Sequence, residues 1–408
     1  MNQNTIAKIS NILPVTLKIR RNLSQSFGIF ISTSRVVDAI RIRKILLLVG
    51  TAFCLLTSYL ACERDFSAVG EKKTPPASDA DTTSHNFVWT IDTFGIGGRG
   101  SSYLLDVSVI NENDIWAVGE IHTAETDTFD SLGNWVPPYN AVRWNGQEWE
   151  LKRILYQGGF WTIRSIFAFS SYDVWFGAIV KWNGLNFIEM PIPGIFIGHS
   201  ISKMWGKSAN DLYVAGTEGL IAHSDGSSWQ ELQSGTTVDL LDVWGSPDGS
   251  VVWACGYTDF EGTVLLKITG LIVELVYEDI DNWFNIRPDS ISGVLTGLWT
   301  NEPSKLHIIT PAGMYVASSN THGEAQRIWT ENNFLPGFPR ALRGQSSNDL
   351  FTAGDFSFMA HYNGASWHIY NRFAGRIRSR GIAITKNLVV LAGLDIQSNR
   401  ATIIRGER

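Results

Sequence analysis

Asp106 and Asp242 are the side chains of this sequence whose type and placement best suit acid–base chemistry. Each stands two residues before the position that is aromatic in most copies of a recurring apolar strand, and Lys203 occupies the same place in a third copy. Two carboxylates that face each other can cleave a glycosidic bond as acid and base, or as acid and nucleophile. We expect these strands to converge, which would bring Asp106, Asp242 and Lys203 to one central funnel.

No other catalytic or metal-binding motif accompanies these residues. The sequence has no HExxH, no cluster of Cys and His ligands, no GxSxG and no glycine loop that would hold a phosphate. We therefore predict no metal, no cofactor and no assigned catalytic residue. A glycan-active hydrolase or lyase that uses the funnel carboxylates remains the alternative function.

His223 and Asp225 suggest a second acid–base pair, but their pattern indicates a scaffold. A basic residue recurs at the place of His223 in five segments, as Arg143, Lys181, His223, Lys267 and His361. An aspartate recurs earlier in four segments, as Asp114, Asp173, Asp211 and Asp349. We predict that the basic residues lie around the outside of a repeat structure, and that each aspartate caps its own turn.

These residues belong to an internal repeat. "NDLYVAG" (210–216) matches "NDIWAVG" (113–119) and "NDLFTAG" (348–354), and "HSDGSSW" (223–229) matches "RWNGQEW" (143–149) and "HYNGASW" (361–367). An Asx-Gly pair between strands predicts a tight hairpin turn with positive φ at both turn residues. Four strands repeated about every 40 residues is the period of a β-propeller blade.

The repeat glycines give the number of blades. They fall at Gly119, Gly177, Gly216, Gly256, Gly354 and Gly393, and the 98-residue gap after Gly256 has room for two units, one of them "KLHIITPAGMYVAS" (305–318). The chain ends at the third strand of the last unit, and "HNFVWTIDTF" (85–94) fits as its missing fourth strand, with Trp89 at the place of Trp149. We predict an all-β, seven-bladed propeller over 86–408, closed by the N-terminal strand.

The unit resembles the "WGSS…DVWAVG…DGxxW" repeats of exported bacterial β-propeller proteins, over about residues 86–408. The resemblance implies the fold and a location outside the cytoplasm, and it implies no defined activity.

Residues 1–62 are predicted to be an N-terminal extension and an export signal. "RIRK" (41–44) precedes an uncharged apolar run, 45–62, with a small residue before Cys62. The ending "YLAC" resembles a bacterial lipobox, in which the cysteine becomes the lipidated N-terminus. An uncleaved anchor helix and simple cleavage are the alternatives. In each case residues 63–408 would lie outside the cytoplasm, and 63–85 would be a polar tether. We expect a membrane-anchored lipoprotein of the bacterial cell envelope.

The charge distribution argues against a nucleic-acid partner. Residues 1–62 carry eight Lys and Arg against one acidic residue, a net charge of +7. Because the whole chain has a formal net charge of −6, residues 63–408 carry −13. An acidic body repels phosphate backbones.

Three of the 16 tryptophans lie outside repeat positions: Trp135 in a long insertion (120–140), and Trp161 and Trp283 in connections between blades. In propellers these loops emerge on one face, so we predict a ligand site there that includes Phe160 and Phe284. Aromatic rings among carboxylates suit stacking on sugars or anchoring of a protein partner, although they would also serve to pack the loops. The leading hypothesis is a non-catalytic propeller that binds a glycan or an envelope protein.

Overall fold

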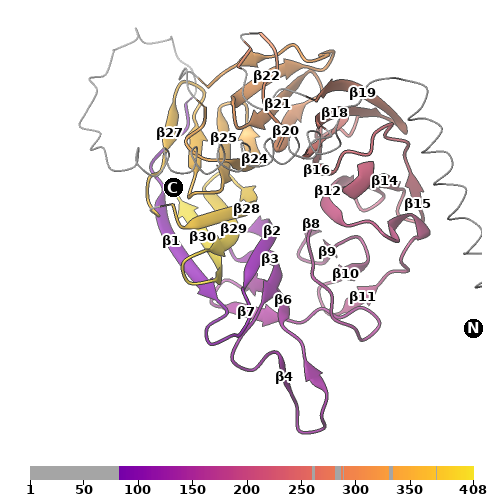
Figure 1. Cartoon of the computed structure of the whole chain (residues 1–408), viewed down its shortest axis with the longest axis vertical. Coiled ribbons are helices and arrows are strands. Elements are labelled where there is room, and N and C mark those ends of the chain that lie inside the picture. The colour runs from indigo at the N-terminus through magenta and orange to yellow at the C-terminus, as the bar shows by residue number, and fades with distance from the viewer. Residues whose placement is uncertain (1–81, 260–261, 281–285, 288, 330–333, 374) are drawn as a thin grey trace, which may run out of the picture. The chain divides into compact units, whose positions relative to one another are not determined.

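The computed structural model describes residues 82–408, apart from 260–261, 281–285, 288, 330–333 and 374 (Figure 1). The predicted signal segment with Cys62, residues 63–81 of the tether, Trp283 and Phe284 lie outside the described residues. No helix within the described part of the chain is long and apolar enough to cross a membrane.

The described residues form seven four-stranded antiparallel sheets, which are the blades of a propeller. Blade 1 contains β2 (Tyr103–Asn111), β3 (Asp114–Ile121), β6 (Tyr139–Trp144) and β7 (Trp149–Lys152), and blade 2 contains β8 (Ile166–Ser170), β9 (Asp173–Phe176), β10 (Val180–Trp182) and β11 (Phe187–Glu189). Blade 3 contains β12 (Ile201–Ser208), β13 (Asp211–Gly216), β14 (Ile221–Ser224) and β15 (Trp229–Glu231). Blade 4 contains β16 (Leu240–Gly245), β17 (Val252–Thr258), β18 (Gly262–Thr269) and β19 (Ile272–Asp279).

Blade 5 contains β20 (Gly297–Glu302), β21 (Lys305–Thr310), β22 (Gly313–Ser318) and β23 (Gln326–Arg327), and blade 6 contains β24 (Pro339–Ser346), β25 (Asp349–Gly354), β26 (Met359–Tyr362) and β27 (Trp367–Ile369). Blade 7 contains β28 (Ile377–Ile384), β29 (Leu388–Asp395), β30 (Arg400–Glu407) and β1 (Val88–Phe94). A short hairpin, β4 (Thr128–Phe129) and β5 (Trp135–Val136), is inserted between β3 and β6. Two single 3-10 turns, η1 (Gly194–Phe196) and η2 (Thr217–Gly219), lie in the connections.

The ring closes as predicted. The innermost strands contact one another in the order β2, β8, β12, β16, β20, β24, β28 and back to β2 (Figure 1). The N-terminal strand β1 pairs with the C-terminal strand β30 over seven residues, from Val88 with Glu407 to Phe94 with Ala401. Trp89 lies opposite Gly406, where a Cβ would come within 2.6 Å of the indole ring. The prediction of seven blades closed by the N-terminal strand is confirmed.

Burial on both sides of each blade explains why the strands are apolar almost throughout. Buried hydrophobic residues form seven clusters within the described residues, one at each boundary between neighbouring blades. In β13, Tyr213 and Ala215 pack toward blade 4, whereas Leu212 and Val214 pack toward blade 2. Because side chains alternate along a strand, one strand contributes to the two cores on either side of it.

In five blades, a close backbone contact explains why glycine stands near the end of the second strand. A Cβ at this position would lie 1.9–2.4 Å from a backbone oxygen at the start of the neighbouring innermost strand, for Gly119, Gly216, Gly256, Gly354 and Gly393. In the same five blades the innermost strand has a β-bulge at this point, so its chain approaches the glycine closely. The glycine of the repeat therefore permits the bulge.

The Asx-Gly hairpins are present, but their turn differs from the prediction. Trp144 pairs with Trp149, so four residues form the loop, and only Gly146 has a positive φ, of 94°. The Asn145 side-chain oxygen accepts the backbone N–H groups of Gln147 and Glu148, both at 2.9 Å. The Asx side chain replaces backbone turn bonds, so a longer loop than the two-residue turn is stable.

The recurrent aspartate and the recurrent basic residue bind each other, which corrects the prediction that each aspartate caps its own turn. The aspartate begins the second strand and the basic residue lies on the third, in the pairs Asp114–Arg143, Asp173–Lys181, Asp211–His223 and Asp349–His361, at 2.8–3.0 Å. In blade 4 the aspartate is replaced by Val251, and Lys267 donates instead to the Ser319 carbonyl at 2.7 Å. These pairs join adjacent strands, so their residues are structural.

The pair in blade 6 is the most buried and includes the closing segment. His361 is fully buried and binds Asp349, which also accepts hydrogen bonds from Arg408 at the C-terminus. The other ring nitrogen of His361 lies 2.8 Å from His85, and Thr83 donates to the Asn348 carbonyl at 3.0 Å. Burial opposes the charge of Asp349, but the bonds from His361 and Arg408 lower its pKa. Residues 83–85, at the end of the predicted tether, thus contact blade 6.

Asp349→Asn and Asp173→Asn test the dependence of these pairs on burial. Asp349→Asn should lower the free energy of unfolding by about 3 kcal/mol, since it leaves the Arg408 charge and His361 without their buried carboxylate. The same change at Asp173, whose pair is roughly one-quarter exposed, should cost about 1 kcal/mol or less. Urea unfolding of both variants measures the difference, and equal losses would contradict the assignment.

The lowered pKa values of two histidines predict that the fold loses stability in acid. Burial, with the nearby charges of His361, His368 and Arg408, lowers the pKa of His85 from 6.5 to about 4. Burial, with Lys305, lowers the pKa of His307 to about 4. Between pH 6.5 and 4 the unfolded chain takes up protons that the folded chain does not, so the free energy of unfolding should fall across this window and change little above it.

Urea midpoints measured at pH 7.5, 6, 5 and 4.5 would show this loss, and His85→Gln should reduce it. Midpoints that stay constant from pH 7.5 to pH 4.5 would show that neither histidine is held neutral.

Candidate functional site

The centre of the ring contains two buried ion pairs. Asp106 of β2 binds the Lys203 ammonium of β12, and Asp242 of β16 binds the Arg343 guanidinium of β24 through two bonds of 2.8 and 2.9 Å. Asp106 and Asp242 are 1% and 3% exposed. The structure thus brings Asp106, Asp242 and Lys203 to the central channel, with a separate cation for each carboxylate.

Each aspartate also joins neighbouring blades through backbone bonds. Asp106 accepts the N–H of Val107 at 2.9 Å and that of Ile166, in the next blade, at 3.1 Å. Asp242 accepts the N–H of Val243 at 3.1 Å and that of Leu298, also in the next blade, at 3.0 Å. The cation in each case comes from the blade after that. The arrangement in blades 1–3 is therefore repeated in blades 4–6.

The electrostatics of the channel favour permanent ion pairs over proton transfer. Burial opposes the charge of Arg343, but the Asp242 carboxylate outweighs it and raises the pKa of the guanidinium. Cys255, opposite Asp242 in the strand register, is fully buried, and burial raises the pKa of its thiol well above the usual value. A carboxylate fixed by a cation and two backbone N–H groups is poorly placed to act as an acid or a base.

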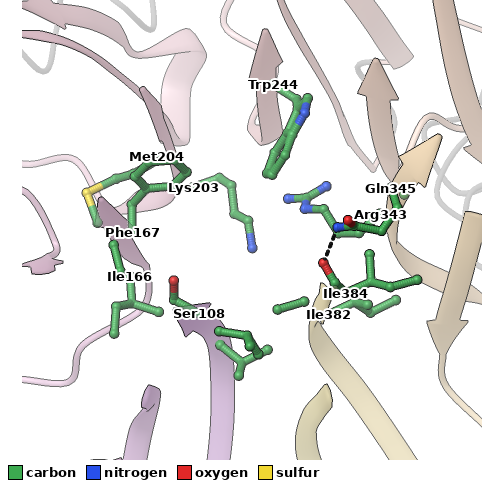
Figure 2. Close-up of a pocket in the computed structure, with 15 residues that line it drawn as sticks. Ser108, Ile166, Phe167, Lys203, Met204, Trp244, Arg343, Gln345, Ile382 and Ile384 are labelled. Atoms are coloured by element: carbon green, nitrogen blue, oxygen red, sulfur yellow. Dashed lines mark hydrogen bonds between the residues drawn. The ribbon is translucent and has the colours of Figure 1, made fainter. Parts of the chain in front are cut away.

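A cavity of about 210 Å³ lies in the channel beside these pairs, toward the ends of the innermost strands (Figure 2). Figure 2 shows the Lys203 ammonium and the Arg343 guanidinium pointing into it, with Arg343 stacked 4.4 Å from the Trp244 ring. The remaining wall is largely apolar, with Met204, Ile382 and Ile384 among its residues. Ligand pockets usually have about 300–1,000 Å³, so this cavity suits only a very small ligand.

Arg343 was not among the predicted site residues, although the sequence holds a signal for it. It stands opposite Phe351, at the position where Trp244 and Trp299 stand in blades 4 and 5. A charged residue in a position that is otherwise aromatic requires a counter-charge when buried.

The hairpin β4–β5 projects beyond the four strands of blade 1 (Figure 1). It carries exposed hydrophobic side chains. Phe129, Leu132 and Trp135 are 71%, 84% and 49% exposed. Its turn is held by Asp130, whose carboxylate accepts the N–H groups of Leu132 and Asn134 at 2.8 Å, and these bonds lower the pKa of Asp130. The exposed side chains are therefore carried by an ordered turn.

Of the five aromatic residues predicted for one ligand site, the three that the structure describes, Trp135, Phe160 and Trp161, have different surroundings. Trp135 contacts Phe160, with ring centroids 6.0 Å apart in an edge-to-face arrangement. Trp161 is partly buried in the core between blades 1 and 2. Its ring lies over Gly177, where a Cβ would come within 2.6 Å of the indole. Trp135 and Phe160 thus come together, and Trp161 packs inward.

The architecture defines a seven-bladed β-propeller, and comparison with solved structures gives the same fold. No family model matches the chain, and no curated protein matches its sequence. YCF48 bound to D1 peptide is 13% identical, with a TM-score of 0.54, over 81% of this chain and all of that one. YCF48 from Cyanidioschyzon merolae is 11% identical, with a TM-score of 0.52, over 78% and 98% of the two chains. The WD40 β-propeller domain of Doa1 is 13% identical, with a TM-score of 0.52, over 78% and 96%. These similarities extend to the fold and no further.

Asp242→Asn tests whether the central pairs are structural. It leaves Arg343, whose side chain is 4% exposed, without a counter-charge, and should lower the free energy of unfolding by about 3–5 kcal/mol. The double variant Asp242→Asn/Arg343→Met removes the unpaired charge and should recover most of that loss. Urea unfolding of the wild type, both single variants and the double variant measures the coupling. Additive losses would contradict the pairing.

Proposed function

We propose that this protein is a non-catalytic, membrane-tethered propeller that binds a protein partner through the hairpin β4–β5. The observation that carries the proposal is the exposure of Phe129, Leu132 and Trp135 together on an ordered turn. Large apolar and aromatic side chains that project together are typical anchors of protein interfaces. Phe160 supports the base of Trp135.

Two considerations favour a protein over a glycan. Sugar binding relies on flat aromatic faces, whereas this hairpin also presents the aliphatic Leu132, and Trp161 packs inward. A propeller with similar architecture, YCF48, has been solved with a peptide bound, which gives a precedent for a peptide partner. The engagement of Asp106 and Asp242 with cations gives no support to the glycan-active alternative. A glycan ligand is therefore tested below as the alternative to a protein partner.

The tether is proposed from the sequence. The basic flank, the apolar run and "YLAC" suggest that Cys62 carries a lipid and that the propeller is displayed in the bacterial cell envelope. Export would place the proposed partner outside the cytoplasm as well.

Cys62→Ser tests the lipid. In a bacterial host supplied with a labelled fatty acid, the wild type should incorporate label and fractionate with membranes, and the variant should lose the label. A wild type without label would exclude lipidation. An unlabelled protein of full length in the membrane would instead indicate the anchor helix.

The double variant Leu132→Ser/Trp135→Ala tests the hairpin. Cross-linking in the native envelope should join the wild-type hairpin to a defined protein, and the variant should reduce this product at least about tenfold, the loss of one or two anchor residues. Leu185→Ser is the matched control, because Leu185 is equally exposed at 81% but lies in a turn of blade 2.

Equal loss in the control would contradict a specific hairpin site. A thermal shift of the full chain with envelope polysaccharides, abolished by the hairpin variant, would replace the protein partner with a glycan.

A further inference from the structure

The bulge of the innermost strand carries an arginine in blades 6 and 7. The register shifts place Arg340 and Arg380 at this position, where blades 1, 3 and 4 have Leu105, Ser202 and Leu241. Arg164 has the same place in blade 2. It stands three residues before Phe167, as Leu105 stands three residues before Ser108. Phe167 pairs with Trp175 in the same way that Ser108 pairs with Trp116.

These arginines lie along a continuous arc of the channel. Strands β24, β28, β2 and β8 contact one another in that order, so the side chains come from blades 6, 7 and 2, with blade 1 between the last two. The bulge precedes the central ion pairs along the strands, whereas the cavity of Figure 2 is lined by the two cations of these pairs and by residues that follow them. The arc therefore lies at the opposite end of the channel from that cavity. Arg378, exposed, begins β28 beside it.

Among the described residues, Arg340 forms an ion pair with a carboxylate, whereas Arg164 and Arg380 do not. Arg340 donates two hydrogen bonds of 2.7 and 3.1 Å to Asp355 and a third, of 3.2 Å, to the Tyr257 hydroxyl oxygen. In the part of the chain that the structure describes, the side chains of Arg164 and Arg380 form no hydrogen bond and no ion pair. Desolvation and the charges of Arg340 and Arg378 lower the pKa of Arg380, and the Asp355 carboxylate partly offsets them, so these groups lie close together.

Among the described residues, the carboxylate of Glu120 forms no direct ion pair with these arginines. It is bound by the Tyr103 hydroxyl at 3.2 Å, by Thr162 at 2.7 Å and by His122 at 2.9 Å. Four guanidinium groups thus surround one end of the channel in a body whose net charge is strongly negative. Such a local cluster attracts a compact anion, while the surrounding charge repels an extended polyanion.

We propose that Arg164, Arg340, Arg378 and Arg380 form a binding site for a ligand that carries two or more carboxylates close together. Guanidinium groups bind carboxylates through paired N–H bonds. Two N–H groups of Arg340, Nε and Nη2, already donate to one oxygen of Asp355. The carboxylates belong to a free polycarboxylate or to the acidic side chains of a peptide. The site is separate from the hairpin, so either proposal can fail alone.

Titration calorimetry of the full chain at low ionic strength tests the site, with citrate, a four-residue Asp/Glu peptide, acetate and inorganic phosphate as probes. Citrate or the peptide should bind at least about tenfold more tightly than acetate and phosphate, a difference of about 1.4 kcal/mol. The tighter of the two identifies the source of the carboxylates. Phosphate that binds as tightly as both would overturn the assignment to carboxylates, and no binding by either would overturn the site.

Arg164→Gln/Arg380→Gln should weaken binding at least about tenfold. Arg164→Lys/Arg380→Lys should restore only part of the affinity, because lysine keeps the positive charge but lacks the paired N–H donors of the guanidinium group. The matched control is Lys207→Gln/Lys305→Gln, which removes the same charge from the end of β12 and the start of β21, at the other end of the channel. An equal loss in this control would show that net charge alone attracts the anion, and would overturn the proposal. Circular dichroism melting curves of each variant confirm that it is folded.

Discussion

The pairing of β1 with β30 is the interaction on which the other contacts of the ring depend. Each blade buries both faces against its neighbours, so blades 1 and 7 have complete cores only when the circle is closed. The last sheet obtains its fourth strand from the opposite end of the chain. Seven long-range backbone pairs, with Trp89 packed over Gly406, therefore stabilise every blade boundary indirectly.

Within the closed ring, one steric requirement sets the properties of the channel. In five blades the repeat glycine permits a bulge at the start of the innermost strand, and the bulge residue is an arginine in blades 6 and 7. The residue after the bulge lies deeper, where Asp106 and Asp242 bind Lys203 and Arg343. The arginines, the ion pairs and a small cavity lined by the two cations and by apolar side chains thus follow one another along the innermost strands.

The architecture could be predicted from the sequence because its signals are local and repeated. The Asx-Gly turns, the aromatic positions and the spacing of the glycines indicated seven blades, and the unmatched strand at 85–94 indicated the closure. The turn geometry could not be predicted in this way, since it depends on a side-chain bond from Asn145 that competes with the shorter turn. The partner of each recurrent aspartate was also missed, although both members of the pairs were recognised.

The central site was only partly predictable, for a different reason. Asp106 and Lys203 are 97 residues apart, and Asp242 and Arg343 are 101 apart, so their pairing depends on the three-dimensional order of the blades. The strand positions predicted that these aspartates would face the channel, but they carried no information on which cation would reach each one. Arg343 departs from the aromatic pattern, and only its burial beside Asp242 explains why.

The location of the closing strand also determines how the fold bears mechanical load. A pull on the N-terminal segment reaches the contacts of Thr83 and His85 with blade 6 first, and then the end of β1 at Val88. Tension directed along β1 loads its seven pairs with β30 together, in shear, whereas tension directed outward separates them one after another. The direction of attachment, more than the number of contacts, would therefore determine the force at which the ring opens.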